Sequence, residues 1–127
     1  MGQPDQRRRR ARRGESLAAL FLRLKGYRIA ARNWRCPIGE LDLVCWHGDT
    51  LVFVEVKTRT SGAAGAAEDA VDFRKRKQLI RLANLYLAQR HRGDVPCRFD
   101  VVGIKLGGFL PRIRHLRSAF RADGLVG

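Results

Sequence analysis

The segment from Thr50 to Lys57 constrains the fold of this chain most, because it reads as a strand that is apolar on both faces. Side chains of a strand point alternately to opposite sides, so one face carries Leu51 and Phe53 and the other carries three valines. Such a strand lies at the centre of a sheet that is covered on both sides. Its far end carries Glu55 and Lys57 on one face. We therefore expect a covered sheet with a charged site at the end of a central strand.

A second strand is expected from Ile38 to Trp46, joined to the first by a turn at residues 47–49. Strict alternation predicts two faces, one with Glu40, Asp42, Val44 and Trp46 and the other with Leu41, Leu43 and Cys45. In this hairpin Asp42 and Glu55 lie opposite each other, within the ~5 Å that separates cross-strand neighbours. Two carboxylates so close repel each other unless a cation lies between them. The hairpin therefore predicts a cation site.

Hard cations such as Mg²⁺ or Mn²⁺ take oxygen ligands and favour one or two carboxylates together with substrate phosphate. Asp42, Glu55 and the carbonyl of Val56 could supply the protein ligands, and Lys57 could hold the attacking water and offset charge in the transition state. The chemistry that this implies is phosphodiester hydrolysis. Two further polar residues are auxiliary candidates, Glu40 and Gln78. The alternative for Glu40 is a solvated ion pair with nearby arginines. The alternative for Glu55 and Lys57 is a plain surface ion pair, worth ~0–1 kcal/mol.

The remaining periodicities fit one domain of residues 14–120. They predict a helix over 15–25, a strand over 27–32, a long helix from Asp72 to about Arg90, a strand over 96–106 and a weaker strand over 111–116. The long helix has the length of a crossover, which would make strand 96–106 parallel to strand 50–57. The expected fold is an α/β/α sandwich with a central mixed sheet and an α-β-β-β-α-β core.

Positive charge dominates the composition, with 26 lysines and arginines against 12 acidic residues and a net charge of +14. Such a surface attracts polyanions, and duplex or branched DNA suits it better than single strands because aromatic residues amount to only 8%. The candidate contacts to nucleic acid are Arg7, Arg8, Arg9, Arg10, Arg59, Arg74, Lys75, Arg76 and Lys77. Residues 1–13 are expected to be a disordered basic tail, and residues 121–127 a frayed end.

Three cysteines without close pairing favour reduced thiols and a cytoplasmic location. A zinc site at Cys36, Cys45 and His47 is disfavoured, because the spacing matches no Cys-x₂-Cys pattern. His115 stands apart from other ligands, which favours a solvated or capping role. No apolar run reaches the ~18 residues of a membrane span. The sequence is also compatible with a homodimer.

Several segments together resemble the YraN-like family of small bacterial proteins, over about residues 14–106. They are Gly14-Glu15, residues 25–27, residues 33–35, Gly39-Glu40-Leu41-Asp42, residues 52–59 and residues 96–102. An acidic residue on one strand followed by Glu-x-Lys on the next also resembles the restriction-endonuclease-like, PD-(D/E)xK nuclease superfamily. This resemblance implies Asp42 and Glu55 as metal ligands and Lys57 as the catalytic lysine. A more distant resemblance to Holliday-junction resolvases implies Glu15 as an auxiliary acid.

Two functions follow from these observations. The first is a Mg²⁺-dependent endonuclease acting on DNA, with branched or repair intermediates among its substrates. The second is a non-catalytic basic protein that binds nucleic acid or associates with ribosomes. The first is favoured, because a pure binder has no reason to place carboxylates where phosphates should dock.

Overall fold

The structure is a computed structural model that describes residues 4–60, 73–90 and 93–120 of the 127-residue chain. Two helices and five strands follow one another along these residues. They are α1 (Pro4–Leu24), β1 (Arg28–Cys36), β2 (Gly39–His47), β3 (Thr50–Thr60), α2 (Phe73–Gln89), β4 (Cys97–Leu106) and β5 (Arg112–Phe120). The expected N-cap Asp72 and the expected frayed C-terminus lie outside the described residues.

The five strands form one mixed sheet in sequence order, β1-β2-β3-β4-β5. β1, β2 and β3 pair antiparallel, α2 then crosses over, and β4 pairs parallel with β3 in the register Leu51↔Cys97 to Thr60↔Leu106. β5 returns antiparallel to β4 and is longer than the weak strand expected there. The expected meander and parallel crossover are therefore confirmed.

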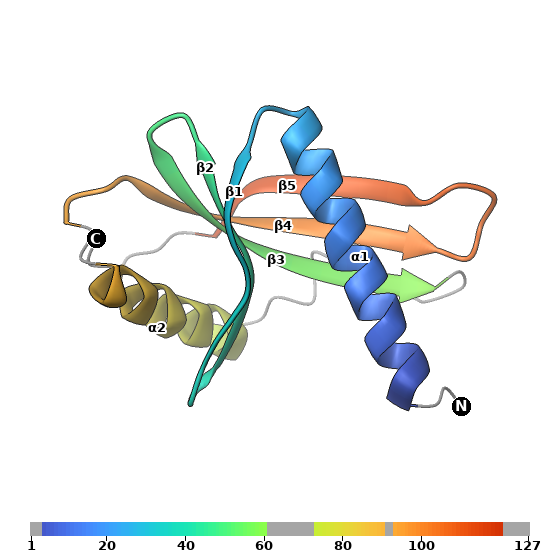
Figure 1. The fold of residues 1–127 in the computed structure, drawn as a ribbon, viewed down its shortest axis with the longest axis horizontal. Coiled ribbons are helices and arrows are strands. Elements are labelled where there is room, and N and C mark those ends of the chain that lie inside the picture. The colour runs from blue at the N-terminus through green and yellow to red at the C-terminus, as the bar shows by residue number, and fades with distance from the viewer. Residues whose placement is uncertain (1–3, 61–72, 91–92, 121–127) are drawn as a thin grey trace.

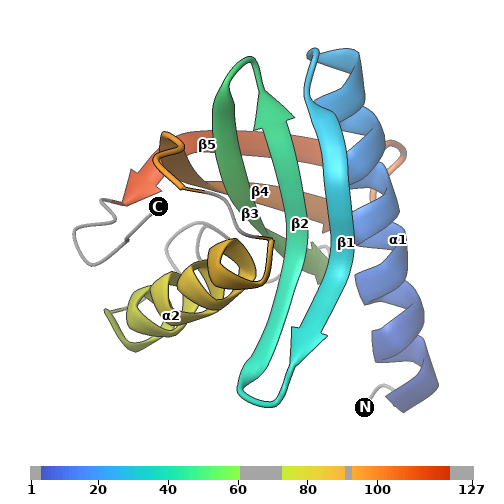
Figure 2. The same ribbon diagram turned by 60° about the vertical axis from the view of Figure 1, so that its left-hand side comes forward.

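One helix packs on each face of the sheet, so the chain has two cores (Figures 1 and 2). The α1 core includes Ala18 and Leu22 of the helix together with alternate residues of β2, β3 and β4. The α2 core includes Leu82 and Tyr86 together with Leu51 and other residues from the opposite face of these strands. β3 contributes to both cores, as its two apolar faces predict.

The arginine run at the start of the chain is helical, which corrects the expectation of a disordered tail. α1 begins at Pro4 and includes every residue from Arg7 to Arg13. The reason is physical: the second half of α1 is fixed in the core, and extending a formed helix costs far less than starting one. Arginine is also a good helix former. The run therefore has a defined position beside β3.

The faces of β2 differ from the strict alternation that the sequence predicts. Leu41 and Val44 both lie in the α2 core, whereas Leu43 lies in the α1 core, so the alternation slips beside Asp42. The cause is a bend of the β1–β2 ribbon away from β3, visible in Figure 2. Its tip contacts α2, where the Gln78 amide donates a hydrogen bond of 2.7 Å to the Ile38 carbonyl. Gln78 thus fixes the tip of the β1–β2 hairpin against α2.

A buried polar network surrounds Asp100, whose side chain is fully enclosed. Asp100 accepts hydrogen bonds from Arg98 Nε at 2.9 Å and from the Ser118 backbone N–H at 3.0 Å, and it pairs with His115 Nε2 at 2.8 Å. The expectation that His115 is solvated or capping is therefore wrong. Burial alone would raise the pKa of Asp100, but these hydrogen bonds outweigh it and lower that pKa to about 2.

Asp100→Asn should destabilise the fold, by about 3 kcal/mol, because it leaves Arg98 and His115 without their charged partner. Since the folded-state pKa lies below the ordinary value of 3.8, the stabilisation is present above pH 4 and is lost as pH falls toward 2. Urea unfolding at several pH values measures this. Equal stability of the variant and the wild type at pH 7 would contradict it, and Asp94→Asn, at an exposed loop site, is the control.

Candidate active site

The open edge of β3 positions Asp42. The β2–β3 register runs from His47↔Thr50 to Leu43↔Val54 and stops there, because β2 bends away. The next backbone N–H of β3 that needs a partner belongs to Val56, and Asp42 Oδ2 accepts its hydrogen bond at 2.8 Å. A side chain thus takes the place of the missing strand bond. This fixes the Asp42 carboxylate beside Val56, in the second half of the central strand β3.

Asp42 and Glu55 are neighbours, as the hairpin predicts, and their carboxyl groups share a hydrogen bond. Burial, the charge of Glu55 and this bond raise the pKa of Asp42 to about 8. The raised pKa reflects how unfavourable two adjacent negative charges are at this position. A divalent cation could relieve this repulsion.

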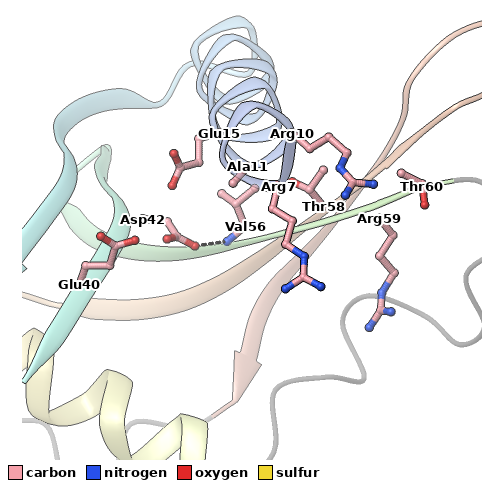
Figure 3. A pocket seen from close by; sticks show the side chains of 10 residues that line it. All are labelled: Arg7, Arg10, Ala11, Glu15, Glu40, Asp42, Val56, Thr58, Arg59 and Thr60. Atoms are coloured by element: carbon pink, nitrogen blue, oxygen red, sulfur yellow. Dashed lines mark hydrogen bonds between the residues drawn. The ribbon is translucent and has the colours of Figure 1, made fainter. Parts of the chain in front are cut away.

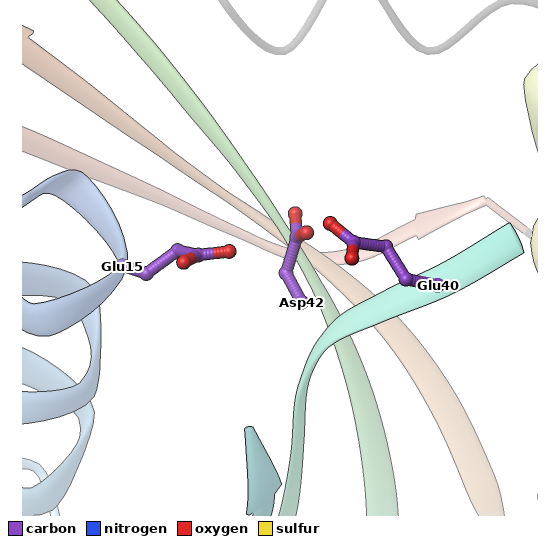
Figure 4. Close-up of side chains that lie close together, drawn as sticks. All are labelled: Glu15, Glu40 and Asp42. Carbon is purple, nitrogen blue, oxygen red and sulfur yellow. The ribbon is translucent and has the colours of Figure 1, made fainter. Parts of the chain in front are cut away.

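Two more carboxylates approach Asp42 from different elements. One oxygen each of Glu15, Glu40 and Asp42 lie within 4.8 Å of one another. Figure 4 shows Glu15 reaching from α1 toward Asp42 and Glu40 on β2. Burial and the charge of Glu40 raise the pKa of Glu15. Asp42 is thus the centre of a four-carboxylate group that also includes Glu55.

Asn33 of β1 holds Glu15 in place. With its amide nitrogen turned toward the carboxylate, it donates hydrogen bonds of 2.7 and 3.1 Å to the two oxygens of Glu15. Its backbone has a φ of 50°, in the left-handed region that costs free energy outside glycine, although asparagine tolerates it better than most residues. Strained backbone gathers at functional sites, which supports a positioning role for Asn33.

Gly14 brings α1 close enough for Glu15 to reach Asp42. A Cβ atom at residue 14 would collide with the Thr58 hydroxyl and would also lie 3.0 Å from Thr58 Cβ. Only a residue without a side chain permits this approach of helix and strand. The neighbouring Glu15, only 8% exposed, is carried into the site by the same contact.

Gly14→Ala should lower the free energy of unfolding by about 1 kcal/mol. Alanine favours a helix by about 1 kcal/mol relative to glycine, but overpacking against Thr58 costs about 1–3 kcal/mol, and we expect the collision to prevail. Thr58→Ala in the same chain should restore the loss. Gly93→Ala is the control, since nothing lies within 4 Å of its added Cβ. Denaturant unfolding measures all four proteins, and a more stable Gly14→Ala variant would contradict the account.

Glu55 also forms ion pairs with two lysines. Its Oε2 lies 3.5 Å from Lys57 Nζ and 3.1 Å from Lys75 Nζ of α2. Glu55 is buried, whereas the two lysine side chains are 26% and 36% exposed. Lys57 shares a face of β3 with Glu55, as predicted. Lys75 reaches the same carboxylate oxygen from α2. The carboxylate group is therefore bordered by positive charge toward α2.

The carboxylates Glu15, Glu40 and Asp42 line one side of a pocket, and three arginines line its other side (Figure 3). They are Arg7 and Arg10 of α1 and Arg59 of β3. Arg59 Nε is buried and finds no hydrogen-bond acceptor among the residues that the structure describes. A buried donor without an acceptor is costly, so this atom suits an acceptor that comes from outside, such as a phosphate oxygen.

Asp42 lies next to Glu55, which pairs with Lys57, and it shares its pocket with Glu15 and Glu40. Glu55 and Lys57 do not line that pocket, and Glu40 also pairs with Arg35 at 2.9 Å. The roles of these residues stay predictions. Arg8 and Arg9 do not line the pocket. On α2, Arg76 lies over the ring of Phe120 and Lys77 over that of Phe73, and Arg74 is exposed. Sequence reasoning assigned no role to Gly14 or Asn33, although both belong to segments that carry the family resemblance. The disfavoured zinc ligands take no part in the carboxylate group.

A family model described as Uncharacterised protein family UPF0102 matches residues 14–104, which include all of these carboxylates. The chain belongs to the UPF0102 family. A UPF0102 protein of Moorella thermoacetica is 50% identical over 100 residues, covering 79% of this chain and 83% of its own length. One of Anaeromyxobacter dehalogenans is 44% identical over 127 residues, covering 99% and 94%. The resemblance to the YraN-like family is thereby confirmed, and the family is uncharacterised by its own description.

Neither helix of the described UPF0102 chain is long and apolar enough to cross a membrane.

Proposed function

We propose that this protein is a metal-dependent nuclease of the restriction-endonuclease-like superfamily that hydrolyses phosphodiester bonds in DNA. The observation that carries the proposal is the cluster of Glu15, Glu40 and Asp42, with Glu55 next to Asp42, beside β3 in a protein of net charge +14. Clustered carboxylates weaken a surface meant only to bind phosphate. Their presence between basic side chains favours chemistry on the phosphate.

The donor set fits a hard divalent cation such as Mg²⁺ or Mn²⁺. Asp42 lies at the centre, hydrogen-bonded to Glu55 and within 4.8 Å of the Glu15 and Glu40 oxygens. Such cations favour carboxylate oxygens and retain several waters. When bound, the cation would polarise the phosphate and lower the pKa of a bound water. Asp42 would be a ligand from the fixed edge of β3, with Glu55 beside it.

The surrounding residues have separate tasks in this proposal. Lys57, two residues after Glu55 on β3, would neutralise charge that develops on the phosphate in the transition state. Arg59 would donate its unpaired Nε–H to a phosphate oxygen. Glu15, held by Asn33 and with a raised pKa, would be an auxiliary acid close to Asp42. Each role depends on a position that the fold fixes.

The ion pairs of Glu55 favour a second candidate, a basic nucleic-acid-binding protein without catalysis. With Lys57 and Lys75 at 3.5 and 3.1 Å, Glu55 has the cations it needs without a metal. That reading predicts a protein indifferent to divalent cations. Melting curves with and without Mn²⁺, beside cleavage assays on linear, flapped and four-way-junction DNA, decide between the two. A nuclease should be stabilised by Mn²⁺ and should cleave; a pure binder should do neither.

The helical arginines should hold the DNA backbone. Replacing Arg7 and Arg10 by Gln should reduce the slope of log K against log salt by about 2, because each lost phosphate contact removes about 0.9. The matched control replaces Arg9 and Arg12, which lie on the opposite side of α1 and do not line the pocket. Fluorescence anisotropy in a salt series measures both. Equal slopes for the two double variants would show that the pocket side of α1 has no special contact.

A further inference from the structure

The sheet face toward α2 changes from apolar to basic along its strands. In β3 and β4 its first half carries Leu51, Phe53, Phe99 and Val101, which α2 covers. The second half lies beyond α2 at the arrow ends of β3 and β4 (Figure 1). There the register places Arg59 beside Lys105, and Lys105 beside Arg112, in one row across three strands.

These three basic residues share the α2 face. Their sequence neighbours Thr58, Ile104 and Ile113 point to the other face, where Thr58 meets Gly14 of α1 and the two isoleucines belong to the α1 core. By the alternation of a strand, Lys105 and Arg112 point away from α1, and Arg59 starts from the same face although its side chain also lines the pocket beside Arg7 and Arg10. Lys105 and Arg112 are exposed. The row therefore continues the positive side of the candidate active site across the sheet.

The hairpin that follows this row presents a bare aromatic ring. Between β4 and β5, Phe109 is 99% exposed and Leu110 is 68% exposed. They line a surface hollow together with the flanking Lys105 and Arg112. An aromatic residue at a hairpin tip between cations suits a polyanion that also offers a flat apolar surface. Nucleic acid has both, since any unpaired base presents a face on which the ring can stack.

We propose that the β4–β5 hairpin recognises DNA with an interrupted duplex: Lys105 and Arg112 hold the backbone, and Phe109 stacks on a base exposed at a flap or branch. This inference rests on the proposed function and specifies its substrate class. Four residues of β3 beyond Val56 and three beyond Leu106 place the tip roughly 20 Å from the carboxylates, about six base pairs along a duplex. The interruption would lie that far from the bond to be cut.

The test compares binding of two DNAs by the full chain without divalent cations. One is a continuous duplex, and the other has the same length with a flap whose junction base is 2-aminopurine. Phe109→Ala should weaken binding of the flapped DNA about tenfold, the loss expected for one stacking contact. It should not affect the continuous duplex, and Phe109→Trp should retain both affinities. Arg112→Gln should weaken both DNAs alike.

The controls separate this inference from other outcomes. Leu24→Ala, at an apolar position that is 80% exposed at the far end of α1, should change neither affinity. Equal effects of Phe109→Ala on the two DNAs, or no effect on either, would overturn the role of the hairpin even if the wild type cleaves DNA. A change in sedimentation with Phe109→Ala would overturn it as well, by assigning the tip to a contact between copies. A wild type that binds flapped DNA through Phe109 but never cleaves would overturn only the nuclease.

Discussion

Asp42→Asn should reduce metal-dependent cleavage on the order of a thousandfold while leaving DNA affinity unchanged or slightly higher. Asp42 lies next to each of the other carboxylates, so removing its charge should weaken the binding of a cation more than removing any other. A loss of several kcal/mol of transition-state stabilisation corresponds to this factor. Affinity should persist, because removing a negative charge also removes a repulsion with phosphate. Initial cleavage rates in Mg²⁺ or Mn²⁺ measure the effect, and Asp49→Asn, in the exposed β2–β3 turn, is the matched control.

The same substitution should change how stability depends on pH. Because the pKa of Asp42 is raised from 3.8 to about 8, its effect on stability is most favourable below pH 4 and is lost as pH rises through about 8. Without divalent cations the melting temperature of the wild type should therefore fall over this window more than that of Asp42→Asn. Mn²⁺ should oppose the fall in the wild type alone. Parallel profiles for the two proteins would contradict a raised pKa at Asp42.

Lys57→Ala should reduce cleavage about a hundredfold, because removing one donor from the developing charge typically costs that factor. Lys75→Ala is the sharpest control, since both lysines pair with the same oxygen of Glu55, at 3.5 and 3.1 Å. Only Lys57 lies on β3 itself, two residues after Glu55, whereas Lys75 reaches Glu55 from α2. We expect Lys75→Ala to lose less than tenfold. Single-turnover rates distinguish the two, and equal losses would show that both lysines merely pair with Glu55.

The strand pairing of this protein could be predicted because local pattern and tertiary structure agree there. Two apolar faces require a covered central strand, and the helix before β4 has the length of a crossover. From this framework the proximity of Asp42 and Glu55 follows directly. The start of α1 could not be predicted in the same way. Repulsion along the arginine run is a local property, whereas the docked half of the helix that offsets it depends on the whole fold.

The remaining part of the site depends on contacts that no periodicity contains. The slip of faces beside Asp42 arises because the β1–β2 ribbon bends to reach Gln78 and Leu82 of α2. Asn33 reaches Glu15 from a left-handed backbone within a strand, a conformation that alternation excludes. A glycine at residue 14 is ordinary in sequence and gains its meaning only beside Thr58.

Cleavage of labelled linear, flapped and four-way-junction DNA by wild type and Asp42→Asn, purified side by side, tests the central claim most directly. The account predicts that the wild type cuts at least one of these DNAs in Mg²⁺ or Mn²⁺ and is inactive with a chelator. It also predicts that Asp42→Asn binds the same DNA without cutting it. Cleavage that persists in Asp42→Asn would indicate a contaminating nuclease. A wild type that binds every DNA but cuts none with either metal would contradict the account.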